Sequence, residues 1–160
     1  MATQLVMYEE EFTKINSVCD RLTKEANARV VFLVDKNGQL ISAAGQTQHI
    51  DTTSLASLTA GNVAAMGGLA KLIGESEFPN QFHEGLKDSI YMTIVGGRVV
   101  LVLIYENRTA NLGLVRLRTK KAAEELTKIL EAILKKNDAP GANSPFAEIS
   151  DDDIDNLFSE

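Results

Sequence analysis

The strongest constraint on the fold is a pair of strand-like runs that are joined by two adjacent glycines, Gly96 and Gly97. Glycine readily adopts the positive φ angles of a tight hairpin turn, so this pair predicts a β-hairpin. In residues 89–95 every second side chain is a large aliphatic one, whereas residues 99–104 are apolar without interruption. We therefore expect the first strand to be half-buried and the second to lie at the centre of a sheet.

The sequence before this hairpin predicts a helix and a second hairpin. Apolar residues recur at the helical spacings of three and four at Leu5, Tyr8, Phe12, Ile15, Cys19, Leu22 and Ala26. Residues 29–34 are an apolar strand, the following Asp-Lys-Asn-Gly sequence ending at Gly38 is a strong turn, and residues 39–44 form the return strand.

Two further helices and one short strand complete the predicted elements. The second helix runs from about Asp51 to Ile73 and stops at Gly74, and a short strand lies near residues 81–86. The last helix follows the main hairpin and ends near Lys136. These elements predict an α/β domain of the α+β kind, with a five-stranded, mostly antiparallel sheet and three helices in layers.

The charge of the chain divides it into a body and a tail. Six of the 22 acidic residues lie in the last thirteen positions, and the other 16 balance the 16 Lys and Arg residues. We therefore predict a neutral domain over residues 1–136, a linker over 137–145 that contains two prolines and a glycine, and a flexible acidic tail over 146–160. A neutral body without a broad basic excess, an aromatic stacking series or a recognised motif argues against nucleic acid as a partner.

The composition also bears on the compartment and on chemistry. The single Cys19 excludes an intramolecular disulfide, and there is no signal peptide and no apolar run near 18 residues, which favours a cytoplasmic protein without membrane insertion. We expect no catalytic residue, no cofactor and no metal, because phosphate-loop and nucleophile motifs are missing and His49 and His83 stand alone.

Small residues recur along the second helix, and glycine in a helix interior costs about 1 kcal/mol relative to alanine. The residues concerned are Ala60, Gly61, Ala64, Ala65 and Gly68. One interpretation is that this face packs on the domain's own sheet. Larger apolar residues at Leu55, Leu58, Met66, Leu69, Leu72 and Ile73 already provide a packing face, so we favour a close-packed interface between two subunits.

Two further segments are candidates for binding. Residues 107–123 contain no acid and five cations, which are Arg108, Arg116, Arg118, Lys120 and Lys121. These cations form either an ordinary solvated surface or a docking surface for a partner. The acidic tail is either a solvated terminus or, because it also carries Phe146, Ile149, Ile154, Leu157 and Phe158, an amphipathic segment that folds on a partner.

The order of elements, with the sequence Asn-Leu-Gly-Leu-Val-Arg at residues 111–116 between the hairpin and the last helix, resembles the roadblock (dynein light chain) domain family. The resemblance covers residues 5–160. It implies a homodimer formed through the small-residue helix and the neighbouring edge strand, and a binding module that regulates an enzyme.

Within that family the chain is similar to bacterial gliding-motility regulators. The resemblance implies that it binds a Ras-like small GTPase of the MglA type in the GTP-bound state and stimulates GTP hydrolysis, in control of cell polarity, with concentration at a cell pole. The implied GTPase-binding residues are Thr13, Lys14, Arg116, Lys120 and Lys121, and the implied tail anchors are Ile154, Leu157 and Phe158. The tail would also modulate nucleotide exchange.

The sequence leaves the route of activation open between an arginine finger and positioning of the GTPase's own residues. The family resemblance favours positioning. The alternative function is a structural, light-chain-like adaptor that has no effect on hydrolysis.

Overall fold

The predicted strands form one antiparallel sheet in a computed structural model that describes residues 8–138 of the chain. The strands are β1 (Val30–Asp35), β2 (Leu40–Gly45), β3 (Asn80–Glu84), β4 (Asp88–Val95) and β5 (Val99–Glu106). Their order across the sheet is β2-β1-β5-β4-β3, and each neighbouring pair is antiparallel. The pairing of β1 with β5 therefore joins the β1–β2 hairpin to the three antiparallel strands β3, β4 and β5.

Both predicted hairpin turns are confirmed. Gly96 and Gly97 have φ angles of 60° and 69°, and the Arg98 backbone N–H donates to the Val95 carbonyl oxygen at 3.2 Å. In the first hairpin the Asp35 carboxylate accepts from two backbone N–H groups at 2.9 Å each, and Gly38 has a φ of 92°. Glycine avoids the backbone strain that a residue with a Cβ atom would have at these positive φ angles.

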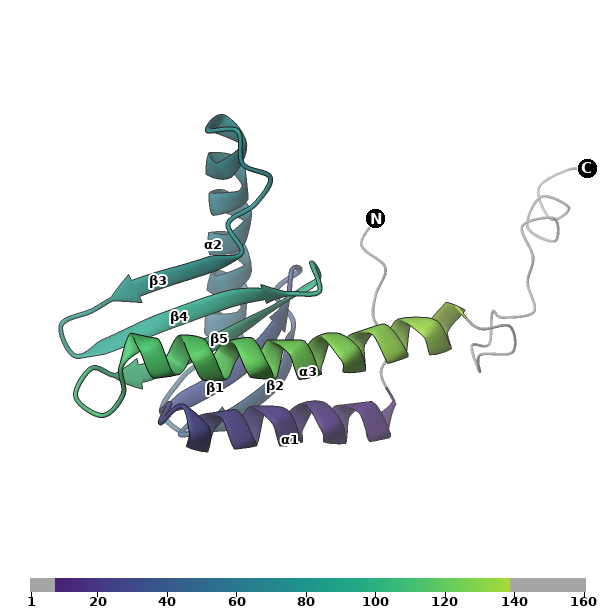
Figure 1. Cartoon of the computed structure of the whole chain (residues 1–160), viewed down its shortest axis with the longest axis horizontal. Coiled ribbons are helices and arrows are strands. Elements are labelled where there is room, and N and C mark those ends of the chain that lie inside the picture. The colour runs from purple at the N-terminus through teal and green to yellow at the C-terminus, as the bar shows by residue number, and fades with distance from the viewer. Residues whose placement is uncertain (1–7, 139–160) are drawn as a thin grey trace, which may run out of the picture.

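Helices cover both faces of the sheet (Figure 1). Helices α1 (Glu9–Glu25) and α3 (Leu112–Asp138) lie side by side on one face, and α2 (Thr52–Leu72) lies on the other. The central strands β1 and β5 are consequently buried over almost their whole length, as predicted for β5. The α+β class is confirmed.

Helices α1 and α3 run antiparallel. The N-terminal part of α1 contacts the C-terminal part of α3 through Glu11 and Lys136, and the C-terminal part of α1 contacts the middle of α3 through Arg21 and Glu125. The predicted apolar face of α1 is buried from Ile15 onwards, but Tyr8 and Phe12 keep 39% and 38% of their surface exposed.

Helix α3 begins after the cap Asn111, whose side chain accepts from the Leu114 N–H at 2.9 Å, and it continues two residues beyond the predicted end. The remaining linker residues and the tail lie outside the described residues.

Helix α2 has the predicted ends. The Asp51 carboxylate caps its first turn by accepting from the Ser54 N–H at 3.1 Å, and Gly74 ends it with a φ of 84°. Its C-terminal half projects past the edge strand β3 (Figure 1).

The expected packing face of α2 is wrong. Leu58 and Leu72 are 73% and 84% exposed, and Leu69 and Ile73 are exposed as well. Of the expected residues Leu55 does meet the sheet, and it does so together with Ala56, Thr59 and Val63. Because apolar residues occur on every side of this helix, periodicity alone could not identify the side that faces the sheet.

Candidate functional site

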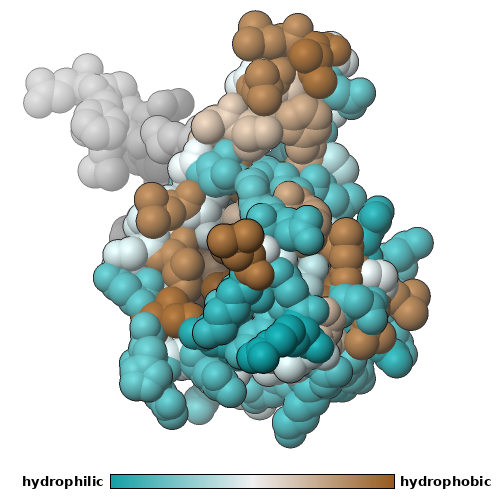
Figure 2. Space-filling view, turned by 90° about the vertical axis from the view of Figure 1, so that its left-hand side faces the viewer, coloured by the Kyte–Doolittle hydropathy of each residue, from teal (hydrophilic) through white to brown (hydrophobic). Residues whose placement is uncertain are grey.

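The exposed side of α2 is an apolar surface. Gly61, Ala64, Ala65 and Gly68 are exposed, while Ala60 is half-buried beside the turn at Gly38. The 21 residues of the helix include one charged side chain, Lys71. Hydrophobic residues gather at the free end of the helix, at the top of Figure 2. An ordinary surface helix has a polar outer side, so this surface is unusual for one that faces water.

The glycines of α2 are not required by their own domain. A Cβ atom built at Gly61, Gly67 or Gly68 would meet no heavy atom within 4 Å. These residues also lack the positive φ angles that would favour glycine. No part of the same subunit therefore approaches these three positions closely enough to require glycine there.

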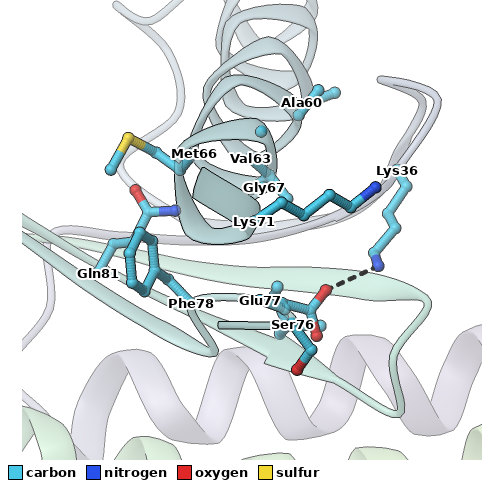
Figure 3. Close-up of a pocket in the computed structure, with 13 residues that line it drawn as sticks. Lys36, Ala60, Val63, Met66, Gly67, Lys71, Ser76, Glu77, Phe78 and Gln81 are labelled. Atoms are coloured by element: carbon cyan, nitrogen blue, oxygen red, sulfur yellow. Dashed lines mark hydrogen bonds and ion pairs between the residues drawn. The ribbon is translucent and has the colours of Figure 1, made fainter. Parts of the chain in front are cut away.

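A groove of 380 Å³ lies between α2 and β3 (Figure 3). The helix side includes Ala60, Ala64 and Gly68, and the opposite side includes Phe78 and Gln81. The small-residue side of the helix thus continues into the edge strand.

Polar groups border this groove. Lys36 and Glu77 form an ion pair of 3.0 Å across it (Figure 3). The Oε1 atom of Gln81 is buried and has no hydrogen-bond partner among the described residues. One polar atom on the sheet side of the groove is therefore unsatisfied.

A second groove, of 590 Å³, lies between the N-terminal half of α3 and β4. It brings together two of the predicted GTPase-binding residues, Arg116 and Lys120. Leu117 lies between them in the sequence, also lines the groove and is 63% exposed. Lys121 is exposed but does not line this groove.

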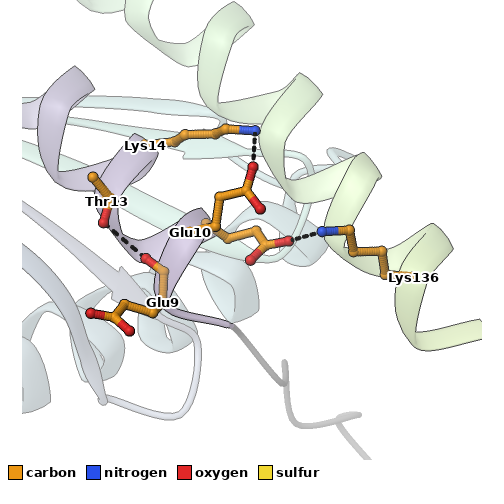
Figure 4. Close-up of polar contacts among 6 residues, drawn as sticks. Glu9, Glu10, Thr13, Lys14 and Lys136 are labelled. Carbon is orange, nitrogen blue, oxygen red and sulfur yellow. Dashed lines mark hydrogen bonds and ion pairs between the residues drawn. The ribbon is translucent and has the colours of Figure 1, made fainter. Parts of the chain in front are cut away.

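The other two predicted contact residues lie elsewhere (Figure 4). The Thr13 hydroxyl donates to the Glu9 carbonyl oxygen at 2.9 Å, and Lys14 lies 3.5 Å from Glu10. Lys14 lines a crevice with Ala132, twelve residues after Lys120 and so about 18 Å further along α3. The structure therefore places Arg116 and Lys120 in the groove and Lys14 in a separate crevice, while Lys121 and Thr13 are exposed and line neither.

The sequence interpretation missed a buried carboxylate at this crevice. Glu11 is 4% exposed, and its Oε1 accepts from the Lys136 ammonium at 2.6 Å. This contact lowers the pKa of Glu11 and raises the pKa of Lys136. The Oε2 atom is buried without a partner in the described part of the chain. The one available signal was position, since Glu11 precedes Ile15 by four residues and so shares its apolar face.

Among the described residues there is no cluster of metal-binding side chains, and the one cysteine is buried. Residues 8–138 contain no group of three or more His, Cys, Asp or Glu side chains that could hold a metal ion. Burial raises the pKa of the Cys19 thiol to about 11, so it is a core residue and a poor nucleophile. No helix in this range has both the length and the apolar content needed to cross a membrane.

Comparisons with known proteins agree with this geometry. A family model described as the Roadblock/LC7 domain matches residues 14–105. Among solved structures, Myxococcus xanthus MglB is 83% identical and covers 84% of this chain and 100% of its own, with a TM-score of 0.78. Gliding protein MglB from Thermus thermophilus is 32% identical and covers 82% and 99%, with a TM-score of 0.75.

A structure described as MglB with a tetrameric arrangement is also 32% identical, covers 83% and 99%, and has a TM-score of 0.77. A comparison with curated proteins finds no match.

Proposed function

Because the chain belongs to the Roadblock/LC7 domain family, we propose that it is a homodimeric regulator that stimulates GTP hydrolysis by a Ras-like small GTPase of the MglA type. The process would be gliding motility under the control of cell polarity, in the cytoplasm and concentrated at a pole. The 83% identity to Myxococcus xanthus MglB supports the motility role. The proposed role is therefore regulation of another enzyme.

The structural observation that carries the homodimer is the exposed side of α2. It is apolar, it bears glycines that its own domain does not need, and it continues into the edge strand β3. A second copy related by a two-fold axis would cover this side with an identical one, so that both helices lose apolar surface to water. The proposed interface consists of Ala60, Gly61, Ala64, Ala65 and Gly68.

The proposed GTPase contact consists of the two clusters on the α1–α3 side. One contains Arg116, Lys120 and the nearby Lys121, and the other contains Lys14 and Thr13, which precedes Lys14 in α1. A small GTPase domain is about 40 Å across, so clusters about 18 Å apart fit within one footprint. The cations of these clusters would speed encounter with an acidic surface.

Activation would proceed by positioning the GTPase's own catalytic groups. Arg116 lies along a groove wall on a regular helix, a poor place for a side chain that must enter another protein's active site. Holding reacting groups in a productive geometry is itself a large source of rate enhancement. The tail anchors Ile154, Leu157 and Phe158, outside the described residues, would contact the GTPase at a second place and modulate nucleotide exchange.

Single-turnover hydrolysis of GTP by an MglA-type GTPase, with and without this protein, tests the proposal. We expect faster hydrolysis with the protein, and a smaller effect with Arg116→Ala or Lys120→Ala. Lys135→Ala is the matched control, since Lys135 is an exposed lysine in the last turn of the same helix.

The outcomes separate the possible mechanisms. If Arg116→Ala loses both binding and stimulation, Arg116 has a docking role. If it loses stimulation but binds normally, Arg116 is an arginine finger. Binding without any change in hydrolysis would support the light-chain-like adaptor instead.

A further inference from the structure

The groove between α3 and β4 has an incomplete lining. Leu117 is 63% exposed on its rim. Thr119 also lines the groove and is 1% exposed, and its hydroxyl has no hydrogen-bond partner among the described residues. A segment seated in this groove would remove Leu117 from water, and the unpartnered hydroxyl of Thr119 is a second feature of the lining that the described residues leave unexplained.

The groove also carries positive charge that the described residues do not neutralise. Neither Arg116 nor Lys120 forms an ion pair with any residue in the range 8–138. Glu124 is the one acidic residue in the lining. The groove therefore suits an occupant that carries several carboxylates together with apolar side chains.

Residues 146–160 of this chain have that composition. They contain six acidic residues and no Lys, Arg or His, and five large apolar side chains are distributed among them. They lie outside the range that the structure describes, and their composition complements the lining of the groove.

The length of the chain permits the contact. Helix α3 ends at Asp138, eleven residues and so about 16 Å beyond Thr127 at the near end of the groove. The seven residues 139–145 span up to about 23 Å when extended. Residues 146–160 can therefore reach the groove while α3 stays intact.

Two other surfaces fit this segment less well. The crevice that contains Lys14 and Lys136 is smaller, at 220 Å³, and the carboxylate of Glu11 already occupies part of it. The exposed side of α2 is apolar but offers one cation, Lys71. The α3–β4 groove alone among these three surfaces combines unpaired cations with an exposed leucine.

We propose that residues 146–160 occupy the groove between α3 and β4 of the same subunit in the free protein, with their carboxylates facing Arg116 and Lys120 and their apolar side chains against Leu117. The docked segment would cover part of the proposed GTPase contact, so that partner and tail compete for one surface. That consequence rests on the proposed function, whereas the docking itself does not.

Paramagnetic relaxation in the full-length protein tests the docking without any GTPase. A spin label is attached to the variant Ser159→Cys, and Cys19 stays unlabelled because it is buried and its pKa is raised to about 11. We expect loss of the amide signals of Thr93, Lys120 and Glu124 at low salt. These signals should return in 1 M salt, where the screening length falls to about 3 Å.

Matched variants identify the cause. The double variant Arg116→Gln/Lys120→Gln should restore the lost signals, whereas Lys135→Gln should leave them lost. Uniform signals throughout, loss centred on Lys14 and Lys128, or loss that the double variant does not relieve would each overturn the proposal. A sample in which labelled and isotope-enriched chains are separate molecules should show no loss, and loss there would assign the contact to a neighbouring subunit and overturn it as well.

Discussion

Replacing Gly61 and Gly68 of α2 by alanine should change folding and association in opposite directions. Each glycine lies inside the helix, and an added Cβ at either position meets no atom of the subunit within 4 Å. Alanine is favoured over glycine in a helix interior by about 0.8–1.0 kcal/mol, so the pair should stabilise an isolated subunit by roughly 2 kcal/mol. For a chain of this length that gain raises Tm by roughly 4–8 °C.

The same methyl groups should weaken the dimer. In a two-fold interface each added methyl group would press against the α2 helix of the other subunit. Overpacking of this kind costs about 1–3 kcal/mol of binding free energy, which raises the Kd of the dimer at least roughly fivefold. Sedimentation over a dilution series measures association, and denaturant unfolding in an Ala64→Arg background measures the fold of the separated subunit. The control is Gly113→Ala in α3, where the new Cβ meets only the Asn111 Oδ1 at 3.4 Å.

A double variant that is more stable and dimerises with unchanged affinity would refute this reasoning. It would mean that the glycines face solvent in the assembly and that the interface lies elsewhere. A variant that is destabilised as a separated subunit would contradict the open space around both glycines.

Three further predictions concern single side chains. Ala64→Arg should yield a folded monomer in sedimentation, because a long cation cannot be accommodated unpaired between closely packed helices, and a dimer of unchanged affinity would contradict it. The Lys136 ammonium holds the pKa of Glu11 below its ordinary value of 4.5, so this carboxylate contributes stability above that pH and loses it as the pH falls through the lower native pKa. Glu11→Gln should therefore flatten the acid limb of a plot of Tm against pH, and an unchanged limb would show that the ion pair does not contribute. The Cys19 thiol should react with a thiol reagent at pH 8 only after the protein unfolds, since burial raises its pKa to about 11, and rapid reaction of the native protein would contradict its burial.

The strands were predictable because their signals are local. The turn residues Gly38, Gly96 and Gly97 adopt the positive φ angles that the sequence indicated, and the uninterrupted apolar run of β5 indicated a strand covered on both faces. Such features depend on a few neighbouring residues and on the two-residue period of a strand.

The orientation of α2 was not predictable in the same way. Apolar or small residues occur on every side of this helix, so its sequence does not indicate which side packs against the sheet. In the structure the small Ala56 meets the sheet, whereas Leu72 faces solvent. The choice between these sides is made by contacts with β1 and β2, which lie outside the helix.

The candidate GTPase surface shows the same limit. The family resemblance implied that Lys14 and Lys120 share one binding surface, and the antiparallel packing of α1 against α3 puts Lys14 beside Lys128 and Ala132. That packing follows from the order of strands in the sheet. It cannot be read from the two helices separately.

The pairing of β1 with β5 also bears on how the chain folds. Each hairpin closes through a short local turn, but Asp35 pairs with Val99, 64 residues later in the sequence. Closing a loop of that length costs roughly 4 kcal/mol of chain entropy beyond a constant, before the apolar contacts between the two strands compensate. Proteins dominated by such distant pairings fold slowly compared with helical bundles of similar stability. The rate at which this domain folds should therefore be governed by the meeting of two preformed hairpins, with the whole of α2 carried in the loop between them.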